Sequence, residues 1–180
     1  DSPVIRTRNT DIHAQCDIVV DVGAKYEPEN HLYDHHQREF TEVLAPYNMK
    51  LSSAGLIYKH FGKDVIREIL ATIEFDCNDD LVAVFYDKLY TGFMEHIDAI
   101  DNGVAIADTP AKYHISTSLS CRVGSLNPSW NEDNSADATN TVFIDAMCMC
   151  QKEFVEATVS LAKSWWPART IVETAIKTRR

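Results

Sequence analysis

A compact apolar segment at residues 16–23 limits the fold of this chain more than any other part of the sequence. It reads CDIVVDVG, with β-branched residues at its centre and Asp21 near its end. Such a continuous apolar run is typical of a fully buried strand in a parallel sheet. Ligands of open α/β sheets gather beyond the carboxyl ends of the strands. We therefore expect Asp21 to occupy a position suited to chemistry.

Helical patterns follow over much of the remaining sequence. Residues 51–62 begin with a Ser pair that can cap a helix and end with a Gly, and residues 63–72 predict a second short helix. Longer helices are expected over residues 78–101, with an Asn or Asp cap, and over residues 143–165, because apolar residues recur there at helical spacing. Pro167 fits the first turn of a last helix.

Together these patterns predict an α/β fold, with a mainly parallel sheet flanked by helices and a helical C-terminal half. Alternating residues at 4–8 predict a further short strand. Scattered Gly and Pro predict that residues 102–136 are mostly loop. We expect an α/β metal-binding domain over residues 1–103 and a mostly helical continuation over residues 104–180.

Composition excludes several classes of protein. The chain is 45% hydrophobic and 24% charged, and no apolar run approaches the ~20 residues that cross a bilayer, so we expect no membrane partner. Five irregularly spaced cysteines argue against a secreted disulfide framework and favour an intracellular location. The net charge of -10 disfavours a protein that grips long nucleic acid by its phosphates, although acidic residues that hold metal ions count in that total.

His31 and the triplet Asp34-His35-His36 form the densest group of side chains that can bind a metal ion. Two adjacent histidines in an irregular segment cannot both face the same way. We interpret His35 as a metal ligand, His36 as a donor to a substrate phosphate, and Asp34 as the group that orients one of the rings. The alternative interpretation of the same residues is a polar surface turn.

Two further carboxylates, Asp98 and Asp101, lie at the end of the predicted helix 78–101 and share one of its faces. If they converge with Asp21 and His35, the donors are mostly oxygen with one imidazole, which suits Mn²⁺ or Mg²⁺. A pair of such ions can activate water and stabilise a phosphoryl centre. The alternative is a solvated acidic helix end, but negative charge there opposes the helix dipole and favours a compensating cation.

Five segments in a fixed order make the chain recognisable: DIVVDVG (17–23), HLYDHHQREF (31–40), KLSSAGLIY (50–58), IDAIDNG (97–103) and WPAR (166–169). Over nearly the whole chain they resemble the Myg family, named for the melanocyte-proliferating gene. The resemblance implies a DHH-like domain of the DHH phosphoesterase superfamily. It also implies a 3′-to-5′ RNA exonuclease located in the mitochondrion, the nucleus or both.

Matched motif by motif, the resemblance also implies roles for single residues. Asp21 would bridge two metal ions and His35 would ligate one of them, while His36 faces the substrate phosphate. The last metal-binding motif of the superfamily maps onto residues 97–103, where both aspartates stay open as the ligand. Asp101 is preferred to Asp98 because it precedes the Asn-Gly turn.

The Ser pair at the start of the helix predicted over residues 51–62 has an implied role as well. Ser52 and Ser53 match a helix start whose backbone N–H groups can bind a phosphate of the substrate. The family also opens with a strand followed by a His-Cys-Asp-Glu type motif, and nothing upstream of Asp1 supplies it. We therefore expect a fragment that lacks the first metal-binding motif and the C-terminal part, so activity of the chain by itself stays open.

Three functions are compatible with this sequence. The leading one is a divalent-metal-dependent phosphodiesterase that uses metal-activated water to shorten RNA or a short oligonucleotide from its 3′ end. The alternative is a phosphohydrolase for a small substrate such as pyrophosphate or a short nucleotide, which the scarcity of basic and aromatic residues favours slightly. A catalytically inactive interaction module is the third. The sequence predicts no oligomeric state.

Overall fold

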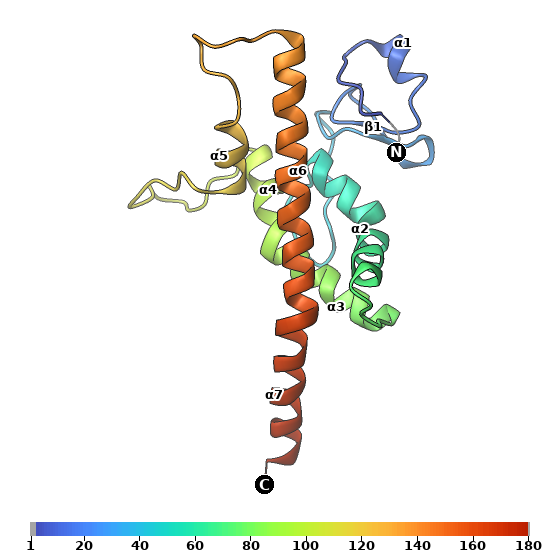
Figure 1. The fold of residues 1–180 in the computed structure, drawn as a ribbon, viewed down its shortest axis with the longest axis vertical. Helices are drawn as coiled ribbons and strands as arrows, with labels where there is room; N and C mark the ends of the chain where they lie inside the picture. Colours follow the sequence, from blue (N-terminus) through green and yellow to red (C-terminus); the bar gives the residue numbers. More distant parts are fainter. Residues whose placement is uncertain (1–2, 180) are drawn as a thin grey trace.

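The computed structural model describes residues 3–179 and has an α/β architecture in which helices predominate (Figure 1). Its sheet has three strands in the order β1-β3-β2, which are β1 (Val19–Val20), β2 (Tyr26–Glu27) and β3 (Leu32–Tyr33). β1 pairs with β3 in parallel, whereas β2 pairs with β3 antiparallel. The sheet is therefore small and mixed, not mainly parallel. The 3-10 turn η1 (Pro28–Asn30) between β2 and β3 is too short for the crossover that a parallel pair needs.

The N-terminal segment corrects two further predictions. Residues 4–8 form no strand, and the first regular element is the short helix α1 (Thr10–His13). In the predicted buried strand only Val19 is buried, while Ile18 and Val20 are 48% and 40% exposed. The reason is that Ile18 and Val20 point to the face opposite Val19, and only the face of Val19 is covered. The parallel pairing predicted for this strand is present, but its full burial is not.

A single helix, α2 (Ser53–Thr72), replaces the two short helices predicted over residues 51–62 and 63–72. The predicted cap is confirmed, because the Ser52 hydroxyl accepts a hydrogen bond from the N–H of Gly55 at 3.1 Å. This bond satisfies one of the N–H groups that have no partner within the helix. The beginning of α2 is therefore set by local chemistry that the sequence shows.

Gly62 does not end the helix as its sequence context predicted, because it serves helix packing instead. The rings of Tyr58 and Tyr86 stack with centroids 4.5 Å apart. A Cβ atom at Gly62 would lie 2.9 Å from a carbon atom of each ring. The missing side chain thus lets α2 approach the helix that carries Tyr86, and α2 continues past the glycine.

The long helix predicted from residue 78 is present as three connected elements. They are α3 (Asp79–Leu89), the π-helical turn η2 (Tyr90–Met94) and α4 (Glu95–Asp101). The side chain of Asn78 caps α3 by accepting the N–H of Leu81 at 2.9 Å. The predicted apolar face is buried against α2 through Val82, Phe85 and Leu89.

The C-terminal part of the chain is helical, as predicted. Residues 102–136 are mostly irregular and contain the short helix α5 (Leu119–Gly124). Three elements then continue without a break as the long rod in Figure 1: α6 (Ala136–Ser160), the π-helical turn η3 (Leu161–Trp165) and α7 (Trp166–Thr178). The predicted second long helix thus begins earlier than expected and runs directly into the last one. Pro167 lies in the first turn of α7, as predicted.

The hydrophobic core lies where α2, α3 and η2 pack against one another and α6 covers α2 and α3. Tyr33 and Leu51 belong to this core and are almost completely buried. Tyr33 directly precedes Asp34, and Leu51 directly precedes Ser52. Two of the segments that carry predicted site residues are therefore anchored in the core immediately before those residues.

Two further features of the described residues concern membrane spans and disulfides. Within residues 3–179, no helix combines the length and the apolar character needed to span a bilayer. All five cysteines in this part of the chain are free thiols. The described residues thus contain no disulfide.

Candidate metal centre

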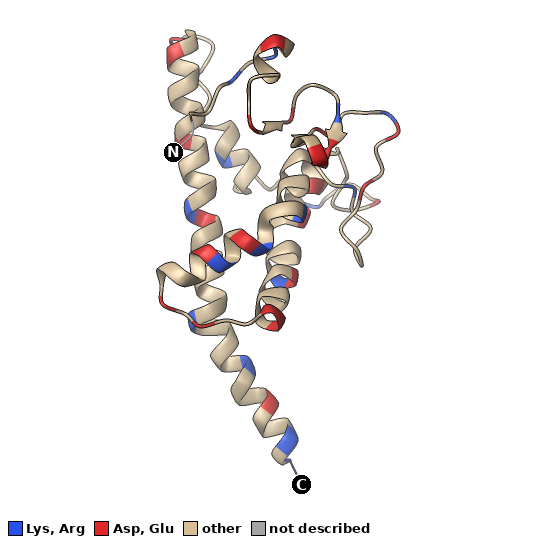
Figure 2. Ribbon diagram, turned by 90° about the vertical axis from the view of Figure 1, so that its right-hand side faces the viewer, with Lys and Arg blue, Asp and Glu red and all other residues tan. Residues whose placement is uncertain are grey.

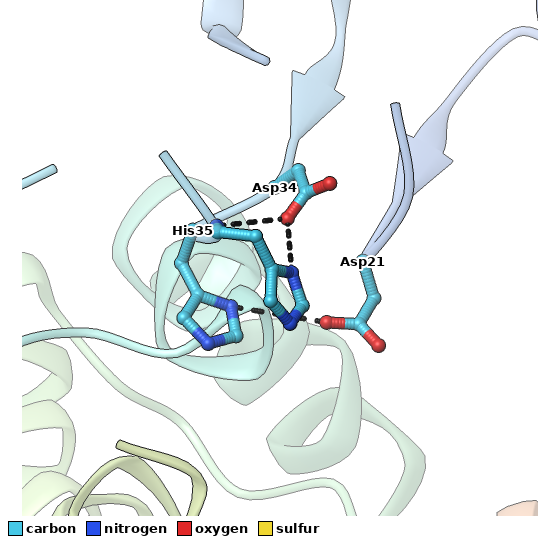
Figure 3. Close-up of side chains that lie close together, drawn as sticks. Asp21, Asp34 and His35 are labelled. Atoms are coloured by element: carbon cyan, nitrogen blue, oxygen red, sulfur yellow. Dashed lines mark hydrogen bonds and ion pairs between the residues drawn. The ribbon is translucent and has the colours of Figure 1, made fainter. Parts of the chain in front are cut away.

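Four side chains that can bind a metal ion meet beyond the ends of β1 and β3. Asp21 follows β1, and Asp34, His35 and His36 follow β3 (Figure 3). One ligand atom from each residue lies within 4.8 Å of those of the other three. The parallel pairing explains this convergence, because both strands end at the same edge, where the N–H of Asp21 donates to the carbonyl of Tyr33 at 3.0 Å.

The turn after β1 gives Asp21 an unusual backbone conformation. Its φ is 64°, in the left-handed region that residues other than glycine adopt at an energetic cost, Asn and Asp most readily. Ala24 in the same turn has a φ of 52°, and its N–H donates to the carboxylate of Asp34 at 2.7 Å. The turn thereby keeps the side chain of Asp21 60% exposed while one of its oxygens lies 3.8 Å from His35.

Asp34 is a buried member of the cluster, and protein groups bond to both of its oxygens. One oxygen accepts from the backbone N–H and the Nδ1 of His36, at 3.0 and 2.6 Å, and the other accepts from Ala24. Burial by itself raises the pKa of Asp34, but the hydrogen bonds from His36 and Ala24 hold that pKa below its ordinary value. The same bond to Asp34 raises the pKa of the His36 imidazole. Asp34 therefore fixes the orientation of His36 through Nδ1.

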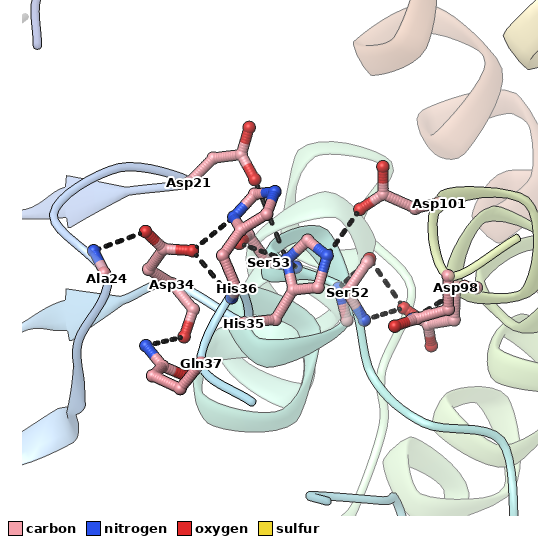
Figure 4. Close-up of polar contacts among 12 residues, drawn as sticks. Asp21, Ala24, Asp34, His35, His36, Gln37, Ser52, Ser53, Asp98 and Asp101 are labelled. Carbon is pink, nitrogen blue, oxygen red and sulfur yellow. Dashed lines mark hydrogen bonds and ion pairs between the residues drawn. The ribbon is translucent and has the colours of Figure 1, made fainter. Parts of the chain in front are cut away.

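His35 is buried between two carboxylates and the start of α2 (Figure 4). Its Nδ1 is 3.8 Å from Asp21, and its Nε2 is 3.3 Å from an oxygen of Asp101. Nδ1 also accepts the backbone N–H of Ser53 at 3.1 Å and lies 2.9 Å from the Ser53 hydroxyl. His35 thus connects the edge of the sheet with the start of α2 and the end of α4.

The two aspartates of α4 occupy different environments although they are three residues apart. Asp98 is completely buried, and its carboxylate accepts the N–H and the hydroxyl of Ser52 at 2.8 and 2.7 Å and the hydroxyl of Tyr90 at 3.2 Å. Burial raises the pKa of Asp98, and these three donors offset part of that effect. The side chain of Asp101 is 49% exposed and faces His35. Asp101 therefore borders the cluster, whereas Asp98 is directed at the start of α2.

Similarity to known proteins extends over the whole chain. The MYG1_exonuc family model, described as an uncharacterised protein family (UPF0160), matches residues 1–180. The chain belongs to this family. No solved structure matches it significantly.

Individual members of the MYG1_exonuc family are similar to the chain over nearly all of its residues. The MYG1 exonuclease of Homo sapiens is 44% identical over 99% of this chain and 48% of its own length. A MYG1 protein of Caenorhabditis elegans is 42% identical over 99% of the chain and 53% of its own length. The MYG1 protein of Dictyostelium discoideum is 40% identical over 100% of the chain and 54% of its own length. The chain thus spans about half the length of the relatives it matches.

In this MYG1_exonuc chain, protein groups already bond to the start of α2. The N–H of Ser52 donates to Asp98 and that of Ser53 donates to His35. Both serine residues are buried. Their contact with a substrate phosphate stays a prediction, while the bonds in the structure hold Asp98 and His35 in place.

Two residues that the sequence reasoning did not single out complete the connections around the cluster. The side-chain amide of Asn102 donates to the carbonyls of Lys50 and Asp98, both at 2.9 Å, and Tyr90 donates to Asp98. Asn102 directly follows Asp101 in the IDAIDNG segment, so its place in that segment could have indicated a role beside the cluster. Tyr90 reaches Asp98 across a π-helical turn, for which the sequence offers no local sign. Together they tie the end of α4 to the segment before α2.

The chemistry of the donors fits a bound cation. Asp21 and Asp101 are exposed carboxylates on two sides of the His35 ring, and within residues 3–179 their ion-pair partner is His35 alone. Two carboxylates around one imidazole leave negative charge that a cation neutralises. The cluster of Asp21, Asp34, His35 and His36, with Asp101 at its border, can therefore hold a metal ion.

Proposed function

We propose that this chain forms the metal-binding part of a divalent-metal-dependent phosphodiesterase, in which water attacks the terminal phosphodiester of RNA from the 3′ end. The observation that carries the proposal is the position of His35 between Asp21 and Asp101, which come from two other elements. The human and mouse relatives are named MYG1 exonuclease, which supports nuclease chemistry. The choice of RNA and the 3′-to-5′ direction rest on the resemblance to the Myg family and the DHH superfamily.

Asp21, His35 and Asp101 are the proposed metal ligands. Their oxygen-rich donors suit Mn²⁺ or Mg²⁺, and the intact protein would hold two ions. A bound pair of such ions lowers the pKa of water and neutralises charge on the phosphoryl oxygens. Asp98, the other aspartate predicted from the sequence, is proposed instead to position α4, because its carboxylate already accepts three hydrogen bonds.

His36 is the proposed contact to the scissile phosphate. Its bond to Asp34 uses Nδ1 and raises its pKa, and Nε2 is the ring nitrogen left for a substrate. An exposed imidazolium can donate a charge-assisted hydrogen bond to a phosphate oxygen. Asp34 then acts through His36 by fixing the ring.

We propose different roles for the two parts of the chain. Residues 1–103 would carry the chemistry as a DHH-like domain, and residues 104–180 would support them through α6, which packs on α2 and α3. The resemblance to the Myg family further suggests an intracellular location, in the mitochondrion, the nucleus or both.

A phosphohydrolase for pyrophosphate or short nucleotides is the second candidate function. It is favoured by the distribution of charge, because in the view of Figure 2 the basic positions are scattered among acidic ones and gather into no continuous stripe. A long RNA is bound more readily by a continuous basic groove. A third candidate, a catalytically inactive interaction module, requires that the cluster has no catalytic role.

The proposal is tested by replacing Asp21 in the full-length protein with Asn, which tolerates the left-handed backbone of this position. We expect Asp21→Asn to reduce Mn²⁺-dependent hydrolysis of 3′-end- and 5′-end-labelled single-stranded RNA at least a hundredfold, because a metal ligand is lost. Asp17→Asn, an exposed change four residues earlier, is the matched control and should keep wild-type turnover.

The same assay separates the candidate functions. Preferential hydrolysis of pyrophosphate would favour the small-substrate enzyme. Unchanged turnover in Asp21→Asn would contradict the proposed metal centre. A full-length protein that is folded but inactive on every substrate would favour the interaction module.

A further inference from the structure

We propose that Ser53 is a positioning residue that selects the tautomer of His35. Its hydroxyl accepts the hydrogen on Nδ1 and so leaves the Nε2 lone pair free for a divalent cation. The inference rests on the proposed function, because it takes His35 as a metal ligand. It differs from the predicted role of Ser53 in binding a substrate phosphate, since here the serine acts through the histidine.

The contact between the two residues involves two polar groups of Ser53 and one nitrogen of His35. The backbone N–H of Ser53 lies 3.1 Å from Nδ1, and its hydroxyl oxygen lies 2.9 Å from the same atom. Both residues are buried. A backbone N–H can only donate, whereas a hydroxyl can either donate or accept. Ser53 therefore offers Nδ1 both a donor and an acceptor, and when Nδ1 carries the hydrogen, the N–H of Ser53 gives up its bond to that atom.

The two groups of Ser53 support different tautomers of a neutral His35. When the N–H of Ser53 donates to Nδ1, the single ring hydrogen is on Nε2 and points toward Asp101, whose oxygen is 3.3 Å away. Nε2 then has no lone pair to offer a cation. When the hydrogen is on Nδ1 instead, Nε2 is free and the net charge of the ring is unchanged.

The second tautomer needs an acceptor at Nδ1, and the Ser53 hydroxyl is the group in the right place. The nearest oxygen of Asp21 is 3.8 Å from Nδ1, which is too far for a hydrogen bond. Asp98 holds the start of α2 through two bonds to Ser52 and thereby keeps the backbone of Ser53 beside His35. When the hydrogen is on Nδ1, the Ser53 hydroxyl is therefore its acceptor, and the free lone pair of Nε2 faces Asp101 and a cation bound there.

The first test measures binding of Mn²⁺ to the full chain by titration calorimetry. Ser53→Ala should weaken Mn²⁺ binding about 10–100-fold, the usual effect of removing the partner of a metal-ligating histidine. Ser53→Thr keeps the hydroxyl and should restore most of the affinity. Ser135→Ala is the control for loss of a serine hydroxyl at the start of a helix away from the cluster. Ser135 caps α6, so this change should lower the melting temperature but leave Mn²⁺ affinity unchanged.

Wild-type affinity in a folded Ser53→Ala protein would overturn the inference and leave the proposed metal centre standing. Absence of Mn²⁺ binding in the wild-type chain would overturn both.

The second test needs no variant and reads the tautomer directly. Nitrogen-15 NMR of His35 in the wild-type chain should show the hydrogen on Nε2 without metal and on Nδ1 after addition of Zn²⁺, a diamagnetic probe that imidazole binds well. A hydrogen that stays on Nε2 while Zn²⁺ binds at the cluster would overturn the inference.

Discussion

At the scale of single residues, Asp98 and Asp101 show how one helix turn can hold two carboxylates with different roles. Asp98 accepts three hydrogen bonds inside the protein, and Asp101 faces His35 from the surface. Removing a hydrogen-bonding partner from a buried group costs about 1–3 kcal/mol, whereas most surface substitutions stay within about 0.5 kcal/mol. Replacing Asp98 should therefore lower the free energy of unfolding more than replacing Asp101 does.

We expect Asp98→Asn to lower the free energy of unfolding by about 1–3 kcal/mol, because an amide nitrogen would replace one of the accepting oxygens. Asp101→Asn should change that free energy little but weaken Mn²⁺ binding at least tenfold. Urea denaturation and calorimetry measure the two quantities in the same samples. The opposite pattern, in which Asp98→Asn is stable but loses Mn²⁺, would reverse the assignment of the ligand.

At the scale of the elements, the approach of α4 to the start of α2 decides whether Asp101 reaches His35. Gly55 in the first turn of α2 permits this approach, since a Cβ atom there would lie 2.2 Å from one carboxylate oxygen of Asp98 and 2.7 Å from the other. The carboxylate of Asp98 is itself held by Ser52, so it cannot move aside without losing hydrogen bonds. The glycine is therefore a requirement of helix packing.

We expect Gly55→Ala to destabilise the fold by about 1–3 kcal/mol, the usual cost of overpacking a buried contact, and to weaken Mn²⁺ binding by displacing α4. Gly92→Ala is the matched control, because a Cβ atom at Gly92, in η2, would meet no packing neighbour within 4 Å among the described residues. It should leave stability unchanged or raise it by up to about 1 kcal/mol through better helix propensity. Equal effects of the two substitutions, measured by thermal unfolding, would contradict the packing argument.

Helices were more predictable than strands because their signals are local. The caps Ser52 and Asn78 can be recognised from neighbouring residues, and both are present. The continuation of α2 through Gly62 depends on the rings of Tyr58 and Tyr86, which no local pattern shows. The mixed sheet depends on pairing between separate segments, so its order and the two-residue length of its strands could not be predicted.

At the scale of the whole molecule, the residues that can form a site were easier to predict than the contacts between their side chains. Asp21, His35 and their neighbours stand out in the sequence because such side chains gather near a strand end and a helix end. Which aspartate of α4 faces His35 depends on how α4 is rotated about its own axis relative to α2. The spacing of Asp98 and Asp101 in the sequence does not determine that rotation. The partnership of Ser53 with His35 likewise appears only once β3 and α2 are placed side by side.

The central claim is that His35 holds a divalent cation together with a carboxylate of Asp21 or Asp101, and it is tested most directly by a crystal of this chain soaked in Mn²⁺. Anomalous scattering then locates the ion without assumptions about activity. The account predicts a manganese peak within coordination distance of His35 and of at least one of the two carboxylates. Manganese bound only at other places, with the three side chains directed away from it, would contradict the account.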